Sequence, residues 1–216
     1  MPEIDLLDRY PKSRRPILER SQATEEDRML ALTFGREYFD GTRQQGYGGY
    51  VYNGWFKPVV TRFIEHYHLA PDEHILDVGC AKGFMLHDFK QALPQSTVAG
   101  LDLSNYAISE AMHSVKPFLT VGNCDCLPYP DKSFDLVISI ATVHNLPLDG
   151  VKVALREIER VSRGRSFIKV NGYRHEAERV ALHQWNVVAK TILHVDEWIS
   201  LFQEVGYTGD YYWFTP

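Results

Sequence analysis

Short apolar runs alternate with amphipathic helical patterns along most of this chain, and that alternation limits its possible folds more than any other feature. The runs that read as strands are "HILDVG" (74–79), "TVAGLDL" (97–103), "FLTVGNC" (118–124), "SFDLVISIA" (133–141), "SFIKVNG" (166–172) and "DYYWFT" (210–215). Strands joined through helices pair in parallel with right-handed crossovers. The pattern therefore predicts an α/β fold, a Rossmann-like three-layer sandwich with a mostly parallel sheet and helices on both faces.

The first part of the chain has a different character, being polar and helical and then rich in turns. We expect an N-terminal helical or lid segment at 1–56, a main domain at 57–216, and an insert at 174–194 within it. Thr24 is a good N-cap for a helix over 24–39 because its hydroxyl can accept a backbone hydrogen bond. The glycine-rich stretch that follows predicts a mobile lid with substrate-facing aromatic residues at Tyr47, Tyr50 and Trp55. Ordinary packing of these rings on the sheet domain is the alternative.

The turn after the first predicted strand is unusual in its spacing. Gly79, Ala81 and Gly83 form G-x-A-x-G, whereas a dinucleotide site favours G-x-G-x-x-G. Gly79 allows a tight turn, Gly83 allows close packing where a helix starts, and Ala81 is small enough for a ligand to pass. We expect a negative φ at Ala81, because alanine tolerates that region without strain. Asp77 ends the strand and suits a ligand that carries an ammonium group better than a pyrophosphate.

Polar residues also follow the next three strands, at the edge where ligands bind in such sheets. Asp102 ends the second strand and is placed to accept the hydroxyls of a ribose. Asn123 follows the third strand and can hydrogen-bond an adenine edge together with the backbone around Cys124. His144 and Asn145 follow the fourth strand and are predicted to face the same crevice.

Taken in order, these motifs resemble those of class I S-adenosylmethionine-dependent methyltransferases, in particular a small bacterial type with a "GDA…LPF" block. The matching stretches are "ILDVGCAKGF", "VAGLDLS" and "GNCDCLPYPDKSFDLVIS", within a resemblance that covers about residues 57–210. The resemblance implies S-adenosylmethionine as cofactor and S-adenosylhomocysteine as product. It implies that the backbone from Gly79 to Gly83 holds the methionyl part of the cofactor. The other cofactor contacts that it implies are Asp77, Asp102, Leu103, Asn123, Cys124 and Ile140.

Three features depart from that family pattern. Ala81 replaces the usual second glycine, and Asn123 stands where an aspartate is commoner. The chain also ends soon after the last predicted strand. We therefore expect the seventh, antiparallel edge strand to be missing or to be supplied by an unusual segment.

The resemblance predicts methyl transfer to a small-molecule or sugar acceptor, at oxygen in preference to nitrogen. His144 is the candidate general base, because an imidazole can take the proton that an oxygen or nitrogen acceptor loses. Its alternative role is to cap a helix or line the pocket. Asn145 and Trp185 are candidate acceptor contacts, with helix packing as the alternative for Trp185. An NAD(P)-dependent oxidoreductase and a non-catalytic cofactor-binding protein are the competing functions.

The composition of the chain limits the kinds of partner that the protein can bind. The net charge of −5 argues against a nucleic-acid partner, which needs a basic face. No apolar run is as long as a membrane span, and the charged N-terminus lacks a signal-type segment, so a cytoplasmic monomer or homodimer is expected. The three cysteines suggest no disulfide framework. We expect no metal site, and interpret His66, His68 and His74 as the end of a surface helix.

Overall fold

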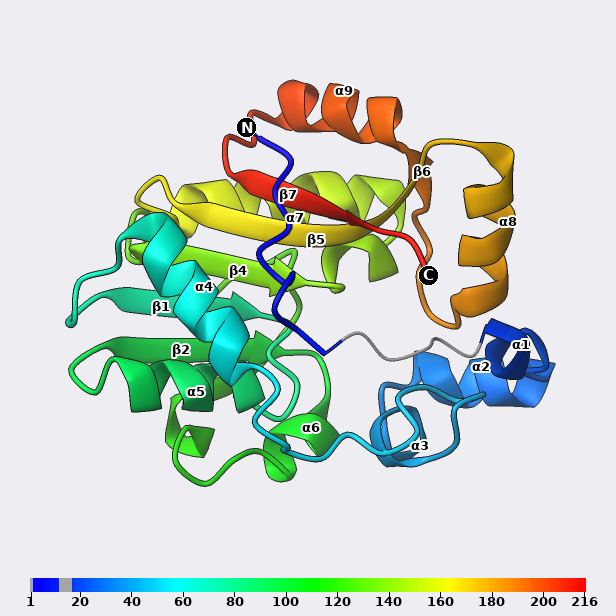
Figure 1. The fold of residues 1–216 in the computed structure, drawn as a ribbon, viewed down its shortest axis with the longest axis horizontal. Helices are drawn as coiled ribbons and strands as arrows, with labels where there is room; N and C mark the ends of the chain where they lie inside the picture. Colours follow the sequence, from blue (N-terminus) through cyan, green and yellow to red (C-terminus); the bar gives the residue numbers. More distant parts are fainter. Residues whose placement is uncertain (1, 12–16) are drawn as a thin grey trace.

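The computed structural model describes residues 2–11 and 17–216, and a seven-stranded sheet forms its centre (Figure 1). The strand order is β3-β2-β1-β4-β5-β6, and β7 also pairs with β5. The order reverses between β1 and β4, which is where an open α/β sheet forms its ligand crevice. The strands are β1 (His74–Val78), β2 (Thr97–Asp102), β3 (Leu119–Val121), β4 (Leu136–Ile140), β5 (Ser166–Tyr173), β6 (Leu193–His194) and β7 (Asp210–Phe214).

Helices cover both faces of this sheet, as the alternation of strands and helices predicts (Figure 1). The helices in the main part of the chain are α4 (Lys57–Tyr67), α5 (Phe84–Ala92), α6 (Asn105–Ser109), α7 (Leu148–Val161), α8 (Glu176–Trp185) and α9 (Val195–Val205), with short 3-10 turns η1 (Lys116–Phe118) and η2 (Val143–Asn145). Side chains of α4 and α5 pack on one face, and those of α7 and α9 pack on the other. In α7, Val151, Leu155 and Ile158 are fully buried at helical spacing, so an apolar stripe docks this helix on the sheet.

The last strand completes the sheet in an unexpected way. β7 runs parallel to β5, with Phe167 opposite Asp210 and Asn171 opposite Phe214. The two-residue β6 continues the same edge, again parallel to β5. The seventh strand is therefore present, and all pairings between the named strands are parallel. On its other side β7 meets the start of the chain, where the amide of Ile4 donates to the carbonyl of Tyr211 over 2.9 Å.

The N-terminal region contains three short helices, α1 (Ile17–Ser21), α2 (Glu25–Leu32) and α3 (Arg36–Asp40). Thr24 caps α2 in a reciprocal capping box with Asp27, as its hydroxyl suggests. The single helix expected over 24–39 is interrupted, because Phe34 has φ +49° and Gly35 is the extended N-cap of α3. The sequence pattern missed this break, since Phe34 itself fits the apolar spacing of a helix.

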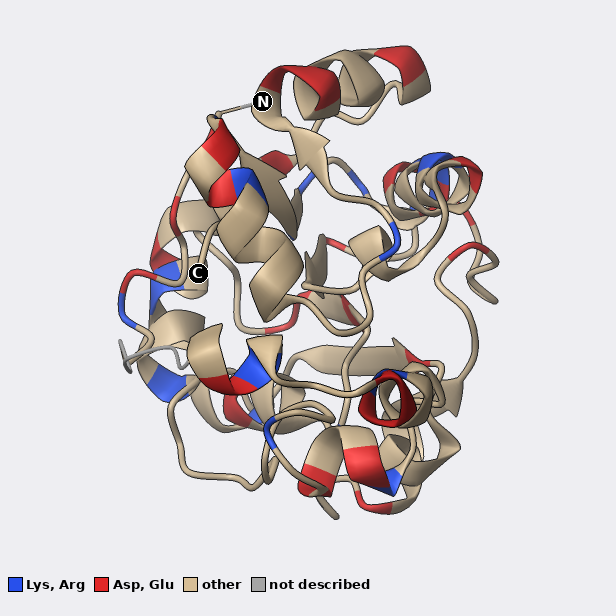
Figure 2. Ribbon diagram, turned by 90° about the vertical axis from the view of Figure 1, so that its right-hand side faces the viewer, with Lys and Arg blue, Asp and Glu red and all other residues tan. Residues whose placement is uncertain are grey.

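These helices lie beyond the carboxyl ends of the strands, next to α8 (Figure 1). The guanidinium of Arg28 donates to the carbonyl of Asn186 over 2.9 Å, and Arg20 lies 4.2 Å from the ring of Trp185. The N-terminal region and the insert after β5 therefore cover the same end of the sheet. Figure 2 looks toward this end, where basic and acidic positions alternate on the ribbon without forming a uniformly basic face.

Candidate active site

A cavity of about 210 Å³ lies at the carboxyl ends of β1, β2 and β4. It is lined by Phe34, Tyr38, Phe39, Tyr47, Gly79, Ala81, Leu101, Asp102, Leu103, Gly122, Asn123, Cys124, Ile140, Ala141, Thr142, Asn145, Leu146 and Lys190. The structure thus brings together the predicted residues Tyr47, Gly79, Ala81, Asp102, Leu103, Asn123, Cys124, Ile140 and Asn145. Residues far apart in the sequence meet here because parallel strands present their carboxyl ends at one edge.

The turn after β1 is built from left-handed residues. Gly79 has φ +88° and Gly83 has φ +73°. A Cβ atom added at Gly79 would overlap the side chain of Thr142, so this position requires glycine for space as well as for conformation. Gly83 is the N-cap of α5 and does not line the cavity.

The prediction of a negative φ at Ala81 is wrong, because φ is +49° there. This conformation turns the amide of Ala81 toward Asp102, and the two form a 2.8 Å hydrogen bond. The methyl group of Ala81 packs in a buried cluster with Phe39 and Ala107. A left-handed alanine costs about 1–2 kcal/mol of conformational energy, which the hydrogen bond and the packing offset. Glycine would supply the conformation but not the packing.

Two buried carboxylates flank this turn. Asp102 accepts the amides of Ala81 and Ser104, each over 2.8 Å, and burial raises its pKa. Asp77 is 6% exposed, and its carboxylate has no hydrogen bond or ion pair within residues 2–11 and 17–216. Burial, and then the charge of Asp102, raise the pKa of Asp77 to about 7. A buried carboxylate without a counter-charge fits a ligand that brings a cation.

His144 lies in η2 but is not on the cavity wall. It is 4% exposed, and its Nδ1 accepts the amide of Asn171 over 3.2 Å. Burial, and then the charge of Lys169, lower the pKa of His144 to about 3. The imidazole is therefore neutral near pH 7 and has Nε2 as the nitrogen left for other partners.

Asn145, the next residue, does line the cavity. Its Nδ2 donates to the carbonyl of Ala141 over 3.3 Å. Its Oδ1 is buried and has no hydrogen-bond partner in the described part of the chain. Ala141 itself has φ +57°, so a left-handed residue follows β4 as well as β1.

Of the aromatic residues predicted to face substrate, only Tyr47 reaches the cavity wall. Tyr50 stacks on Phe84, with 4.8 Å between ring centroids. Trp55 is 41% exposed and lies edge-to-face with Tyr10. Trp185 packs under the guanidinium of Arg20. The roles of Tyr50, Trp55 and Trp185 toward substrate stay predictions.

The other cavity residues were not expected from the sequence, namely Phe34, Tyr38, Phe39, Leu101, Gly122, Ala141, Thr142, Leu146 and Lys190. The three aromatic residues come from the break between α2 and α3 and from α3 itself. Their spacing is that of an ordinary amphipathic helix, and no local signal says that this face covers a ligand site. Lys190 lies near the end of the insert at 174–194, for which the sequence showed only a polar composition.

A buried ion pair connects the N-terminal region to the turn after β1. Lys82 lies in that turn, and its Nζ contacts the carboxylate of Asp40 at the end of α3 over 2.6 Å. The same carboxylate accepts the hydroxyl of Tyr106 over 2.6 Å and the amide of Tyr50 over 3.0 Å. The Lys82 side chain is only 8% exposed, so this pair holds the two regions together away from water.

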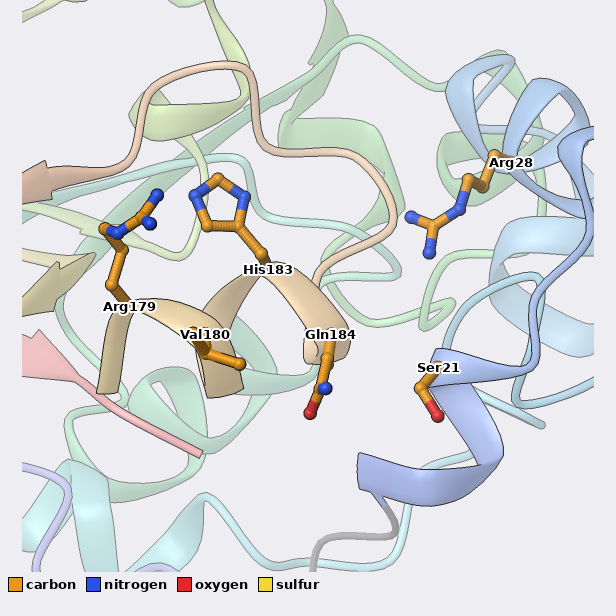
Figure 3. A pocket seen from close by; sticks show the side chains of 6 residues that line it. All are labelled: Ser21, Arg28, Arg179, Val180, His183 and Gln184. Carbon is orange, nitrogen blue, oxygen red and sulfur yellow. The ribbon is translucent and has the colours of Figure 1, made fainter. Parts of the chain in front are cut away.

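A second and more open hollow of about 410 Å³ lies between α1, α2 and α8 (Figure 3). Arg179 and His183 project from α8, and Arg28 points toward them from α2. Both arginines are already engaged, Arg179 with Glu176 over 2.7 Å and Arg28 with the carbonyl of Asn186. None of the predicted cofactor residues lines this hollow. The cavity at the strand ends is therefore the candidate active site.

Residues 76–168 match a family model described as a methyltransferase domain. The demethylmenaquinone methyltransferase of Symbiobacterium thermophilum is 34% identical over 107 residues, which are 46% of this chain and 42% of that protein. The fatty-acid O-methyltransferase of Mycolicibacterium smegmatis is 32% identical over 94 residues, 42% of this chain and 34% of that protein. This chain thus spans about half the length, or less, of these curated relatives.

The fold is shared with a solved S-adenosylmethionine-dependent methyltransferase from Archaeoglobus fulgidus. The TM-score is 0.56 at 17% identity, over 79% of this chain and 72% of that one. Within residues 2–11 and 17–216, no helix is long and apolar enough to span a bilayer. The family match over residues 76–168, the parallel sheet and the order of the motifs along it support a class I S-adenosylmethionine-dependent methyltransferase.

Proposed function

We propose that this protein transfers a methyl group from S-adenosylmethionine to a small-molecule or sugar acceptor, at oxygen in preference to nitrogen. The observation that carries the proposal is the pair of buried carboxylates, Asp77 and Asp102, on either side of the left-handed turn. Asp77 lacks a cationic partner, and Asp102 keeps acceptor capacity beyond its two backbone bonds. A nucleoside that carries an amino acid needs both groups, whereas a pyrophosphate would be repelled by them.

In this proposal each part of the cofactor has its own residues. Asp77 binds the ammonium group, and the backbone of Gly79 to Gly83 lies along the methionyl part. Asp102 accepts the ribose hydroxyls. Asn123 and the backbone at Cys124 bind adenine, and Leu103 and Ile140 supply apolar contact. When bound, S-adenosylmethionine supplies a methyl group on a positively charged sulfur, and that sulfur keeps the bonding electron pair and leaves as the thioether.

The main work of the protein is then to align the acceptor and exclude water. Phe34, Tyr38, Phe39 and Tyr47 form an aromatic wall over the cavity. The buried Lys82–Asp40 pair holds this wall on the cofactor turn. Oxygen as the acceptor atom is supported by the similarity to the fatty-acid O-methyltransferase.

Calorimetry tests the cofactor assignment. We expect wild-type protein to bind S-adenosylmethionine and S-adenosylhomocysteine, but not NAD. Asp102→Asn should weaken S-adenosylhomocysteine binding by about 10- to 100-fold, the effect of losing hydrogen bonds to a charged group. Asp131→Asn is the matched control, because Asp131 lies on the surface in an exposed ion pair. Binding of NAD without either sulfur compound would overturn the proposal in favour of an oxidoreductase.

His144 remains our candidate base, with a specific test. The low pKa makes it a weak base, and its Nδ1 is used by Asn171, so only Nε2 could take the proton of the acceptor. His144→Gln keeps a similar volume and polarity. A loss of turnover of about 100-fold or more, with unchanged affinity for S-adenosylhomocysteine, would support the base. Unchanged turnover would assign His144 to the support of η2 instead.

A further inference from the structure

The loop that joins β3 to β4 forms part of the cavity wall without a helix or strand element of its own. It spans residues 122–135, all of which the structure describes. Gly122, Asn123 and Cys124, at its start, line the cavity. The backbone groups of a loop need hydrogen-bond partners of some kind, and these partners decide where the loop runs. The partners of this loop therefore shape that part of the cavity wall.

One side chain of α7 supplies several of these partners. The guanidinium of Arg160 donates to the carbonyls of Leu127 and Tyr129, over 3.0 and 2.8 Å. It also donates to the carboxylate of Asp131 over 2.8 Å, and to both carboxylate oxygens of Glu157, each over 2.7 Å. A guanidinium has five N–H donors, and these contacts use all of them. The loop and α7 together therefore fix the orientation of Arg160.

Glu157 precedes Arg160 by almost one helical turn and also holds the loop directly. Its Oε2 accepts the amide of Leu127 over 2.8 Å. Both backbone groups of Leu127 are thus bonded to α7, and its side chain is buried in the same apolar cluster as that of Cys124. The hydrogen bonds from Arg160 lower the pKa of Glu157, so its carboxylate is ionised near pH 7. Glu157 and Arg160 together form what we call the α7 clamp.

Only a short turn separates the clamp from the cavity wall. The amide of Cys126, which precedes Leu127, donates to the carbonyl of Asn123 over 3.1 Å. On the other side of the wall, the amide of Gly122 donates to the carbonyl of Asp102 over 2.9 Å. The stretch that lines the cavity is therefore held by β2 before it and by the α7 clamp after it.

We propose that the α7 clamp positions the recognition of the cofactor base. Glu157 and Arg160 fix the loop so that the side chain of Asn123 and the backbone at Cys124 meet the adenine edge. This inference rests on the proposed function and deepens it. Neither clamp residue lines the cavity, so both act through the loop as positioning residues. Loss of the clamp should weaken binding of the base and spare the ribose and amino-acid contacts, which belong to the turns after β1 and β2.

Arg163 provides a matched control on the same loop. Its guanidinium donates to the carbonyl of Lys132 and to the carboxylate of Asp135, each over 2.8 Å. These bonds resemble those of Arg160, but they lie just before β4 begins, at the opposite end of this strand from the cavity. A difference between Arg160→Met and Arg163→Met therefore reports the place of the clamp rather than the loss of an arginine.

Calorimetry with two ligands tests the clamp. S-Adenosylhomocysteine carries the base, and S-ribosylhomocysteine, measured by competition, has the same ribose and amino acid without it. We expect Arg160→Met to weaken S-adenosylhomocysteine about 10-fold, as the loss of one well-placed hydrogen bond does. S-ribosylhomocysteine should bind this variant as it binds wild type. Arg163→Met should change neither affinity.

Hydrogen exchange of the ligand-free protein gives a readout that does not depend on the cofactor. The amides of Cys126 and Leu127 should exchange faster in Arg160→Met than in wild type or in Arg163→Met, because their loop has lost its partner. Glu157→Gln keeps an acceptor for the Leu127 amide and should show both effects to a smaller degree. It carries both measurements if thermal unfolding shows that Arg160→Met does not fold.

The proposal is overturned if the clamp variants leave this exchange unchanged or weaken both ligands equally. It is also overturned if Arg163→Met weakens S-adenosylhomocysteine as much as Arg160→Met does. Failure of wild-type protein to bind S-adenosylhomocysteine would instead overturn the proposed function.

Discussion

At the scale of single residues, the raised pKa of Asp77 makes the stability of the fold depend on pH. Its pKa is about 7 in the folded protein against an ordinary value of 3.8. The folded state therefore binds more protons than the unfolded state between these values, and stability falls as pH rises from about 4 to about 7. The ligand-free protein carries this cost, of about 4 kcal/mol, at pH 8. We expect Asp77→Asn to raise its melting temperature at pH 8 and to have little effect at pH 4. Equal effects at the two pH values would contradict the assignment.

Under the proposed function, the same carboxylate should give cofactor binding a pH dependence of the opposite sign. An ammonium group prefers ionised Asp77, so the affinity for S-adenosylhomocysteine should rise about 10-fold from pH 6 to pH 8. 5′-Methylthioadenosine has the same nucleoside without the ammonium and should show no such rise. Calorimetry at several pH values compares the two. Parallel pH profiles would show that Asp77 does not contact the amino-acid part of the cofactor.

A substitution at Gly79 tests how closely the turn after β1 approaches the turn after β4. Gly79→Ala places a methyl group on the side chain of Thr142 at a φ of +88°. We expect a loss of about 2–4 kcal/mol of unfolding free energy, from overpacking together with left-handed strain. Adding Thr142→Gly removes the clash but not the strain, so the double variant should recover about half of the loss. Denaturant unfolding of both single variants and the double variant measures the coupling.

At the scale of elements, the sequence predicted six of the seven strands and their alternation with helices, but not the two-residue β6. Local apolar spacing is enough for them, as α7 with its buried stripe shows. The break at Phe34 and the left-handed Ala81 were missed, because a tertiary partner decides each of them. Ser104 Oγ donates to the carbonyl of Phe34, and Asp102 binds the amide of Ala81. Residues far from a segment in sequence leave no local pattern in it.

The ion pair between Asp40 of α3 and Lys82 in the turn after β1 can be tested at the same scale. Asp40→Asn leaves Lys82 buried without a counter-charge, which costs about 3–5 kcal/mol in comparable pairs. We expect a large drop in thermal stability and faster release of S-adenosylhomocysteine, because the aromatic wall loses its anchor. Glu204→Gln breaks the exposed Lys152–Glu204 pair and should cost at most about 1 kcal/mol. Similar losses in both variants would show that the Asp40 pair is not the anchor.

At the scale of the whole molecule, the part of the cavity wall at the strand ends was predictable from the sequence, and the part supplied by the N-terminal region and the insert was not. Gly79, Asp102, Asn123 and Cys124 lie after consecutive strands, and the parallel sheet alone brings them together. Lys190 reaches the cavity because backbone hydrogen bonds hold the end of the insert on η2, which is far from it in the sequence. Chain folding of that kind depends on long-range contacts that neither periodicity nor motif spacing encodes. The division of the chain at residue 56 likewise stays a prediction.

The first residues of the chain offer a test of whether that division is a folding boundary. Leu6 is completely buried among residues of α4 and the sheet, and Arg9 bonds Glu65 over 2.7 Å. We expect Leu6→Ala to cost about 2–5 kcal/mol, as buried leucines do, and to lower the melting temperature by about 2–4 °C per kcal/mol. Leu18→Ala, at a side chain that is 73% exposed, is the control. If the N-terminal region and the sheet form one cooperative unit, Leu6→Ala shifts a single calorimetric transition. A second, unshifted transition would instead show that the sheet folds without the start of the chain.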